Sequence, residues 1–395
     1  MIGKLLSRLH RDLHGTFTIF MDESRSVFGD TGVIIFFFVV PLLYPLLYSW
    51  LYNNETVKDV PVAIVDQSHS PESRDFITRV DATEGIRVRY HANSVEEGKQ
   101  AVMSQECRGV IVIPQDFASK LVRKEQNIIH AYVDMSGILY YKGVLISLTD
   151  VSMTYGLSEA PLRYEAVPLF NPSAGYGSFL LPSVLILIIQ QTLLLGIGLA
   201  AGTARENNRF GLLIPELHHK YDMIHIVLGK ALCYFLIYLI LGAYIAVAVP
   251  HLFHFIQLAD MYSILYLLIP YILACIFLGM TLSVLIRYRE NVIMLVIFTS
   301  VPLLFLSGIS WPDTAISGAY KAIAHLFPST FGINGFIKMN SMGAGTEDIN
   351  NEIIWLWALA GVYFVTACFV YWIQITRFRN WRLSDMTPAT NNKRE

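Results

Sequence analysis

Charged residues are scarce in this sequence. Asp, Glu, Lys and Arg make up 15% of its 395 residues, whereas 54% are hydrophobic and the mean hydropathy is +0.48. An ordinary soluble protein carries roughly 25% charged residues, so the composition argues against a soluble enzyme. The formal net charge of −2 also gives no reason to expect a basic surface that would neutralise the phosphates of a nucleic acid.

Paired cysteines and a removable leader are also missing. Cys233, Cys275 and Cys368 fall inside apolar runs, and Cys107 is alone in the large polar segment, so no disulfide framework can be read. We expect Cys107 to be the only cysteine that a membrane-impermeant thiol reagent modifies from outside. Residues 1–30 are amphipathic and lack the apolar core and cleavage site of a signal peptide. We expect a cytoplasmic helix there.

Six apolar runs contain no Asp, Glu, Lys or Arg. Each has about 20 residues or more, which is the length that crosses a bilayer, and a chain in lipid must satisfy its own backbone hydrogen bonds as a helix. The predicted fold class is an α-helical polytopic membrane protein with six transmembrane helices and an inserted α/β extracytoplasmic domain. The runs are 32–52, 176–202, 231–250, 262–286, 291–311 and 353–375.

The short connections between these runs differ in their content of Lys and Arg. One side holds fifteen of them, and the loops of the other side hold two. Cationic side chains are retained on the cytoplasmic side, so we expect a multi-pass protein of the plasma (inner) membrane with both termini cytoplasmic. The fifteen lie in residues 1–30, 203–230, 287–290 and the tail 377–395, and the two are Lys321 and Lys338.

The segment 53–174 has the composition of a small soluble α/β domain, and the charge distribution places it outside. Strands that alternate with helices favour a mixed or parallel sheet. Two functions remain open for this domain: a gate or docking site for a partner, and a folded insert that stabilises a dimer or the ends of the spans. The expected strands are 60–66, 86–90, 107–114 and 128–134, and the expected helices follow the N-caps Ser70 and Asn93, span 115–125 and begin near Leu139.

The cytoplasmic connection 203–230 is too long and too regularly patterned for a simple turn. Leu213, Leu217, Tyr221 and Ile224 recur at helical spacing. A helix with one apolar face beside a membrane can lie in the interface or insert into a groove on another protein. The spacing leaves both possibilities open.

The same connection resembles the cytoplasmic coupling segment of ABC type-2 transporter permeases, through TARENNRFG and a downstream LGK. That family usually has an Arg-Glu pair, then Gly-Thr-Leu-Glu, and a Gly-Lys at the next span. This sequence departs from the pattern where two leucines, Leu212 and Leu213, replace Thr and Leu and the second Glu is missing. The matching residues are Arg205, Glu206, Gly211, Gly229 and Lys230.

Two further parts of the chain resemble this family. Residues 307–345 are similar to its extracytoplasmic re-entrant region after the fifth span. VPVAIVDQSHSPESRDF (60–76), GVIVIPQDFASKL (109–121) and Asp134 are similar to the extracytoplasmic domain of the subfamily with a large insert after the first span. The resemblance thus implies a transmembrane domain of spans two to six at 175–376, in addition to a first span at 31–52.

A phosphate-binding GxxxxGK[ST] loop is absent from the sequence. The resemblance implies that a separate cytoplasmic ABC ATPase binds ATP and Mg²⁺, that this chain binds no cofactor, and that it works beside a second permease copy. A periplasmic adaptor is a further candidate partner. The residues expected to couple this chain to the ATPase are Arg205, Glu206, Arg209, Gly211, Leu213, Gly229, Lys230, Arg287, Arg289 and Glu290.

Three polar residues are candidates for a translocation path. Gln190 and Gln191 lie midway along the second span and Ser307 lies near the end of the fifth. An interhelical hydrogen bond that holds the bundle together is the competing role for the glutamines. No catalytic group is expected, because no nucleophile and base occur at credible spacing. A metal site is not expected either, because His251 and His254 lack a firm third ligand.

The sequence therefore predicts the permease subunit of an ATP-driven ABC exporter that moves a hydrophobic or amphipathic substrate. An ion-coupled carrier is disfavoured because such carriers place ionisable side chains at mid-membrane depth, and the six runs have none. A non-transporting membrane scaffold or sensor with an extracytoplasmic receptor domain stays open as the alternative.

Overall fold

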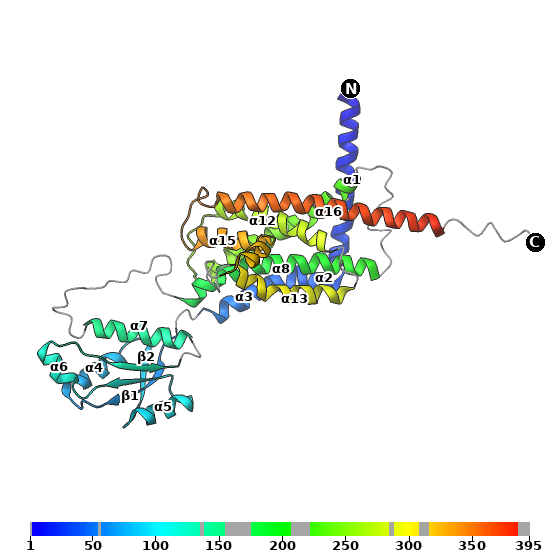
Figure 1. Ribbon diagram of the computed structural model, residues 1–395. Coiled ribbons are helices and arrows are strands. Elements are labelled where there is room, and N and C mark those ends of the chain that lie inside the picture. The colour runs from blue at the N-terminus through cyan, green and yellow to red at the C-terminus, as the bar shows by residue number, and fades with distance from the viewer. Residues whose placement is uncertain are drawn as a thin grey trace, which may run out of the picture. The chain divides into compact units, whose positions relative to one another are not determined.

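The computed structural model describes residues 2–53, 57–134, 138–154, 175–206, 222–283, 288–307 and 316–385. The chain forms two compact units. One consists of residues 54–176, and the other combines residues 1–53 with residues 177–395. Figure 1 shows the first unit as a small sheet with helices and the second as a bundle of long helices.

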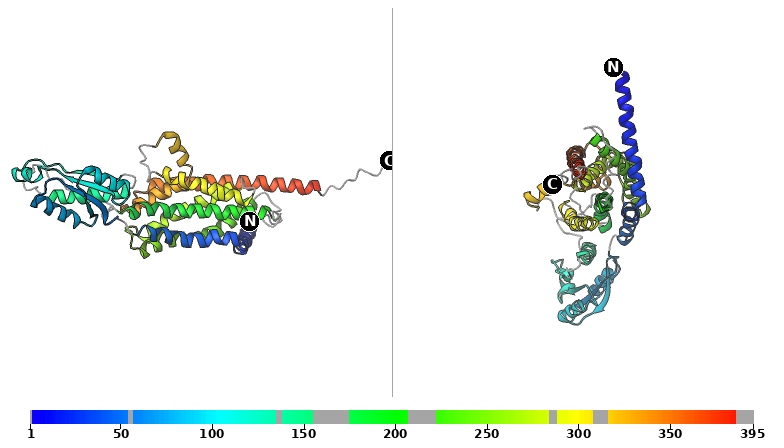
Figure 2. Two further views of the ribbon diagram at one scale, coloured as in Figure 1. Left: turned by 90° about the horizontal axis from the view of Figure 1, so that it is seen from below. Right: turned by 90° about the vertical axis from the view of Figure 1, so that its right-hand side faces the viewer.

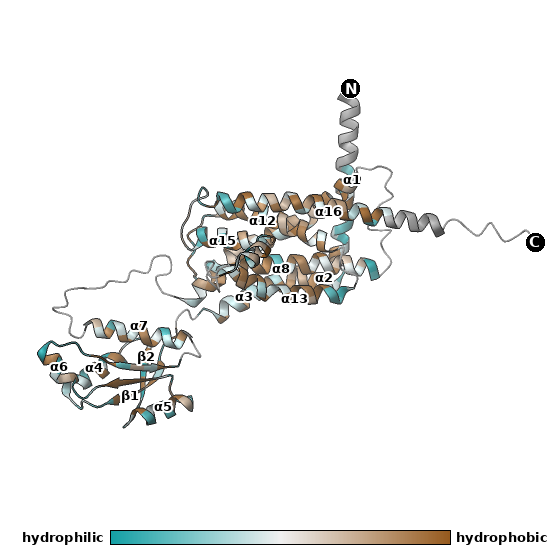
Figure 3. Cartoon of the chain, in the orientation of Figure 1, coloured by the Kyte–Doolittle hydropathy of each residue, from teal (hydrophilic) through white to brown (hydrophobic). Residues whose placement is uncertain are grey.

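The bundle unit contains six helical stretches that are long and apolar enough to cross a membrane. Each overlaps one of the predicted runs, which confirms the polytopic helical fold. Apolar residues extend along most of their lengths (Figure 3). The stretches are Thr31–Leu51, Tyr176–Glu206, Met223–Leu252, Met261–Leu282, Arg289–Leu306 and Asn350–Thr376.

Thirteen helical elements are described in this unit, and two of them are π-helical. They are α1 (Ile2–Gly29), α2 (Thr31–Ile34), η1 (Ile35–Val39), α3 (Val40–Leu51), α8 (Tyr176–Glu206), α10 (Asp222–Ala243), η2 (Tyr244–Ala248), α11 (Val249–Leu252), α12 (Met261–Leu282), α13 (Arg289–Leu306), α14 (Gly318–Ala324), α15 (Pro328–Asn340) and α16 (Asn350–Asp385).

Helices α8 and α12 form the core of the bundle. In α8, 89% of the most apolar 18-residue stretch is buried, compared with 17% of the corresponding stretch in α13 and 22% in the first span. Helix α12 packs against α10, α15 and α16, and Figure 2 shows the long helices lying side by side. The first span and α13 therefore present most of their side chains outward.

Each of the two π-helical segments ends two residues before a proline. The segment η1 precedes Pro41, and η2 precedes Pro250. A proline inside a helix lacks an N–H and its ring crowds the carbonyl four residues earlier. The wider turn of a π-bulge accommodates that crowding, so both helices continue past the proline.

The third span begins earlier than the sequence predicted. The predicted run starts at residue 231, but α10 begins at Asp222 and the apolar stretch at Met223. Lys230 is therefore inside the helix, and it is only 5% exposed. A lysine can occupy that position because its charge is paired, as described below.

Residues 54–176 contain a four-stranded sheet in the order β2-β1-β3-β4. β1 pairs in parallel with β2 and β3, and β4 pairs antiparallel with β3, as the prediction of a mixed sheet allowed. The strands are β1 (Val60–Asp66), β2 (Ile86–His91), β3 (Gly109–Ile113) and β4 (His130–Val133), and the helices are α4 (Pro71–Asp81), α5 (Val95–Met103), α6 (Phe117–Arg123) and α7 (Ile138–Thr154).

Hydrophobic side chains of this sheet pack into two clusters. One contains Ile64, Phe76 and Ile111 and extends to α7 through Val144. The other contains Val65, Ala101 and Val110. Since neighbouring side chains of a strand point to opposite faces, Ile64 and Val65 belong to different clusters, and each face of the sheet has its own core.

One local prediction in this unit was wrong, and the structure changes what we expect of a second. The N-cap of α5 is Ser94 rather than Asn93, because the Ser94 hydroxyl accepts a hydrogen bond from the Glu97 amide at 3.1 Å. Cys107 is 1% exposed, and burial raises the pKa of its thiol. Its position in a polar segment does not make it accessible, so a thiol reagent is expected to modify it slowly.

Candidate coupling site

The described residues that we expected to couple this chain to an ATPase gather where α1 meets the bundle. Figure 1 shows α1 crossing the end of the bundle, steeply inclined to the long helices. Two ion pairs connect α1 and the residue after it to the bundle, one to α10 and the other to α13. We call Glu23, Asp30, Lys230, Tyr234 and Arg289 the junction cluster.

The first ion pair is buried between α1 and α10. Lys230 Nζ lies 2.5 Å from Glu23 Oε2, and the Tyr234 hydroxyl donates a hydrogen bond to Glu23 Oε1. Glu23 and Lys230 are 4% and 5% exposed. Both carboxylate oxygens are therefore occupied, which is the condition under which a buried charge is tolerated.

Gly229 allows α1 and α10 to approach closely. A Cβ at this position would lie 2.8 Å from the Thr16 carbonyl oxygen and 2.9 Å from Ile19 Cβ. One turn earlier on α10, His225 Nδ1 is 3.2 Å from Thr16 Oγ1. The structure thus places Gly229 and Lys230 against α1, so any part they take in coupling would pass through that helix.

The second ion pair connects the start of the first span to α13. Asp30 is the N-cap of α2, and its Oδ1 accepts hydrogen bonds from the amides of Gly32 and Val33. Arg289 Nη2 lies 3.1 Å from the same oxygen. Glu206, at the end of α8, accepts a hydrogen bond from the Arg289 amide at 2.9 Å. Arg289 of α13 thereby connects the start of α2 to the end of α8.

Charge stabilisation at Asp30 exceeds the cost of its burial. Burial by itself opposes ionisation, but the pKa of this carboxyl is lowered. The hydroxyl of Thr203 lies nearby, without a well-formed hydrogen bond, and together with the amide of Val33 and the Arg289 guanidinium it favours the carboxylate. Asp30 is therefore ionised near neutral pH.

The remaining residues with an expected coupling role have different placements. Arg205 lines a cavity of about 30 Å³ together with Glu23 and Lys230, and Glu290 is exposed in the first turn of α13. The structure thus brings Arg205, Glu206, Gly229, Lys230 and Arg289 to one end of the bundle. Arg209, Gly211, Leu213 and Arg287 lie outside the described residues.

Glu23 and Asp30 were missed in the sequence analysis. A signal for Glu23 exists, because Ile19, Glu23 and Val27 are spaced four residues apart and share one face of α1. All three are buried. A carboxylate between two apolar residues on a buried face calls for a cationic partner. Asp30 carried the weaker signal of an N-cap type directly before an apolar helix.

The translocation candidates differ from one another in hydrogen bonding. Gln190 is fully buried, receives a hydrogen bond from the Ser329 amide at 2.8 Å and donates one to the Ser329 hydroxyl at 3.1 Å. It therefore connects α8 to α15, as the competing interhelical role requires. Ser307 is 2% exposed and donates to the Leu304 carbonyl. Both amide atoms of Gln191 are buried without a hydrogen-bond partner among the described residues.

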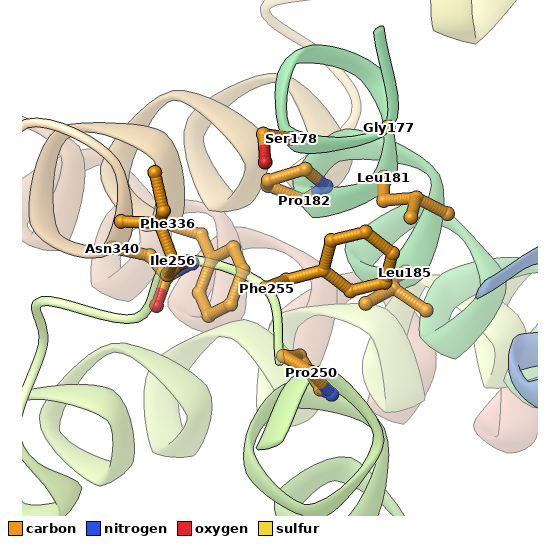
Figure 4. A pocket seen from close by; sticks show the side chains of 10 residues that line it. All are labelled: Gly177, Ser178, Leu181, Pro182, Leu185, Pro250, Phe255, Ile256, Phe336 and Asn340. Atoms are coloured by element: carbon orange, nitrogen blue, oxygen red, sulfur yellow. Dashed lines mark hydrogen bonds between the residues drawn. The ribbon is translucent and has the colours of Figure 1, made fainter. Parts of the chain in front are cut away.

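An apolar pocket of about 10 Å³ lies at the other end of the bundle, between α8, α15 and the loop after α11. Figure 4 shows the rings of Phe255 and Phe336 between the α8 side chains and Pro250. Asn340 donates to the Ile256 carbonyl, and its own side-chain oxygen is buried without a partner among the described residues. The pocket has room for about one water molecule.

Among the described residues, no three His, Cys, Asp or Glu side chains are grouped as metal ligands would be. A search of curated proteins found no match to the chain. Residues 31–369 match the family described as ABC-2 family transporter protein, which is well over half of the 395 residues.

Proposed function

Because this chain belongs to the ABC-2 transporter family, whose members are membrane subunits of ABC transporters, we propose that it is the permease of an ATP-driven exporter. It forms the translocation path for a hydrophobic or amphipathic substrate, beside a second permease copy in the plasma (inner) membrane. A cytoplasmic ATPase binds ATP and Mg²⁺, and a periplasmic adaptor is a candidate further partner. Both termini are cytoplasmic, and residues 53–174 and 307–345 lie on the opposite side.

The junction cluster is the observation that carries the coupling proposal. Force applied by an ATPase to residues 203–230 would act at the C-terminal end of α8 and the N-terminal end of α10. Glu206, at the end of α8, contacts α13, and Lys230, farther along α10, contacts α1. The Lys230–Glu23 contact is buried, and buried, well-packed contacts transmit displacement because they are not continuously deformable. Movement at the connection would therefore reach the first, third and fifth spans together.

The test combines coupling and assembly in one reconstituted system. The permease is co-purified with its ATPase, and ATP-dependent release of substrate is compared between the wild type and the double variant Arg205→Ala/Glu206→Ala. We expect the ATPase to remain bound while export falls at least about tenfold, the scale of losing an interaction of about 1.4 kcal/mol. Arg79→Gln, in the other unit, provides a control substitution at an exposed ion pair.

Unchanged ATP-dependent export by the double variant would contradict the coupling role. The scaffold alternative makes a different prediction, because a scaffold would purify without an ATPase whose turnover responds to substrate. Co-purification of an ATPase with substrate-dependent turnover favours the permease directly.

Gln191 is the polar residue that we place on the path. Gln191 lies in the central helix and is 7% exposed. Its two amide atoms have no partner among the described residues, so a passing polar group could bond to them at little cost. Replacement by Leu, which is close in size, should lower export without lowering the melting temperature, because an unpartnered buried amide stabilises nothing. A fall in both quantities would indicate a structural role instead.

A further inference from the structure

A polar pocket of about 450 Å³ lies beside the junction cluster, where the end of α1 meets α2, α8 and α13. Arg25 and Arg289 line it, together with the hydroxyl-bearing residues Ser26, Thr31 and Thr203. Asp30 is the one acidic side chain of its described lining. We propose that this pocket binds the phosphate group of a membrane phospholipid.

The Arg289 guanidinium is held in place by Asp30, and this contact uses only part of its N–H donors. An ideal Cβ on Gly32 would lie 2.4 Å from Arg289 Nη2, so glycine at this position is what makes room for the guanidinium. Asp30 is its only ionic partner among the described residues and contacts Nη2 alone. A guanidinium has five N–H donors. The others are available to a phosphate, and the Arg289 side chain is 35% exposed.

Arg25 supplies the second cation, and Asp30 offers little repulsion. The Arg25 side chain is 77% exposed and only loosely paired, with Nη1 3.7 Å from Asp22 Oδ1. Asp30 Oδ1 is already shared by Arg289 and two backbone amides, and Oδ2 is buried. Two guanidinium groups beside hydroxyl donors suit a phosphate, since arginine binds phosphate through paired N–H groups.

The helices that line the pocket favour a lipid over a soluble phosphate. From Thr31, exposed apolar side chains continue at intervals of four residues through Ile35, Val39 and Leu43. From Arg289, a second stripe at the same interval runs through Ile293, Ile297, Val301 and Phe305, all more than a third exposed. Residues four apart share a helix face, so acyl chains can extend from the pocket along both stripes.

Binding to the purified full-length chain in detergent, with no ATPase present, tests this site separately from the transport proposal. Titrations followed by native mass spectrometry use three probes. Dioleoyl phosphatidylglycerol carries the phosphate and the chains, dioleoylglycerol carries the chains alone, and glycerol 3-phosphate carries the phosphate alone. The variants are Arg25→Gln, which removes an exposed cation, and Gly32→Val, which displaces the Arg289 guanidinium. Arg79→Gln is the control, since Arg79 also forms an exposed ion pair within one helix.

We expect the wild type to bind phosphatidylglycerol at least about tenfold more tightly than dioleoylglycerol, and glycerol 3-phosphate not to compete. Arg25→Gln and Gly32→Val should each weaken phosphatidylglycerol binding about tenfold, and Arg79→Gln should leave it within about twofold. Equal binding of dioleoylglycerol would overturn the phosphate assignment. Effective competition by glycerol 3-phosphate would overturn the lipid assignment. Wild-type affinity in Arg25→Gln overturns the site itself, whether or not Gly32→Val folds.

Discussion

In the junction cluster, replacing one residue of the buried ion pair is expected to destabilise the protein more than replacing both. Glu23 and Lys230 are buried together, so removing one leaves the other charged, desolvated and unpaired. Removing both leaves only a volume to fill. This asymmetry distinguishes a buried ion pair from an exposed one such as Lys99–Glu96, with its charged atoms 3.3 Å apart on the surface of α5.

Lys230→Met is therefore expected to lower the free energy of unfolding by about 3–5 kcal/mol, the usual cost of an unpaired buried charge. The double variant Glu23→Gln/Lys230→Met should recover most of that loss, since Gln still accepts a hydrogen bond from Tyr234. Unfolding in mixed detergent micelles gives the values. Lys99→Met, as the exposed control, should change the free energy by no more than about 1 kcal/mol. An equal loss in the single and double variants would contradict the pairing.

The lowered pKa of Asp30 predicts a pH dependence of stability. A carboxyl with a folded-state pKa below its unfolded value contributes stability above the unfolded pKa of about 3.9, and this contribution is lost as the pH falls through the folded pKa. The melting temperature of the wild type should exceed that of Asp30→Asn by a constant amount from pH 7 to about pH 5. The difference should shrink at lower pH. A difference that persists unchanged to pH 3 would be incompatible with this assignment.

At the scale of elements, the sequence could predict what depends on local pattern. The six spans follow from runs without charge, and β1 follows from the apolar residues of 60–66. The start of α10 could not be predicted this way. Lys230 marks the start of the uncharged run that follows it, and its partner Glu23 is 207 residues away in the sequence. The same holds for Gln190, whose partner Ser329 is on α15. Pairing across long separations is a property of packing, and local pattern does not identify the partner.

Burial of a single side chain within its element escapes local pattern in the same way. Cys107 precedes β3 and packs with Val65 and Val110, whereas Met103, at the end of α5, is 84% exposed. In the intact protein, a membrane-impermeant maleimide should modify Met103→Cys rapidly from outside and Cys107 at least about tenfold more slowly, since the thiolate is the reacting species. Equal rates would show that Cys107 is accessible.

The same reagent tests the proposed topology. Rapid labelling of Asn207→Cys from the outer side would contradict the cytoplasmic placement of the connection 203–230.

At the scale of the whole molecule, the two units have separate cores. The sheet unit buries Ile64 and Ile111, and the bundle has its own buried contacts around α8 and α12. Cooperative unfolding is a property of a single core, and multidomain chains commonly unfold in more than one step. Stability in one unit therefore need not follow stability in the other.

Calorimetry of the full-length chain should show this independence. Ile64→Ala, which opens a cavity in the sheet core, is expected to destabilise residues 54–176 by about 2–5 kcal/mol and to lower one transition only. Lys230→Met should lower the other. If both substitutions shifted every transition equally, the two units would be one cooperative body.

The length of α16 has a consequence for the space next to the membrane. Its 36 residues give a helix of about 54 Å at 1.5 Å per residue, whereas a bilayer with its headgroups is about 40–45 Å thick. Once the apolar stretch Asn350–Thr376 is placed in lipid, the last turns of α16, up to Asp385, extend beyond the membrane surface. These turns occupy space at the end of the bundle where α1 also ends. A globular partner that binds this end of the bundle has to lie beside them, and they restrict its orientation.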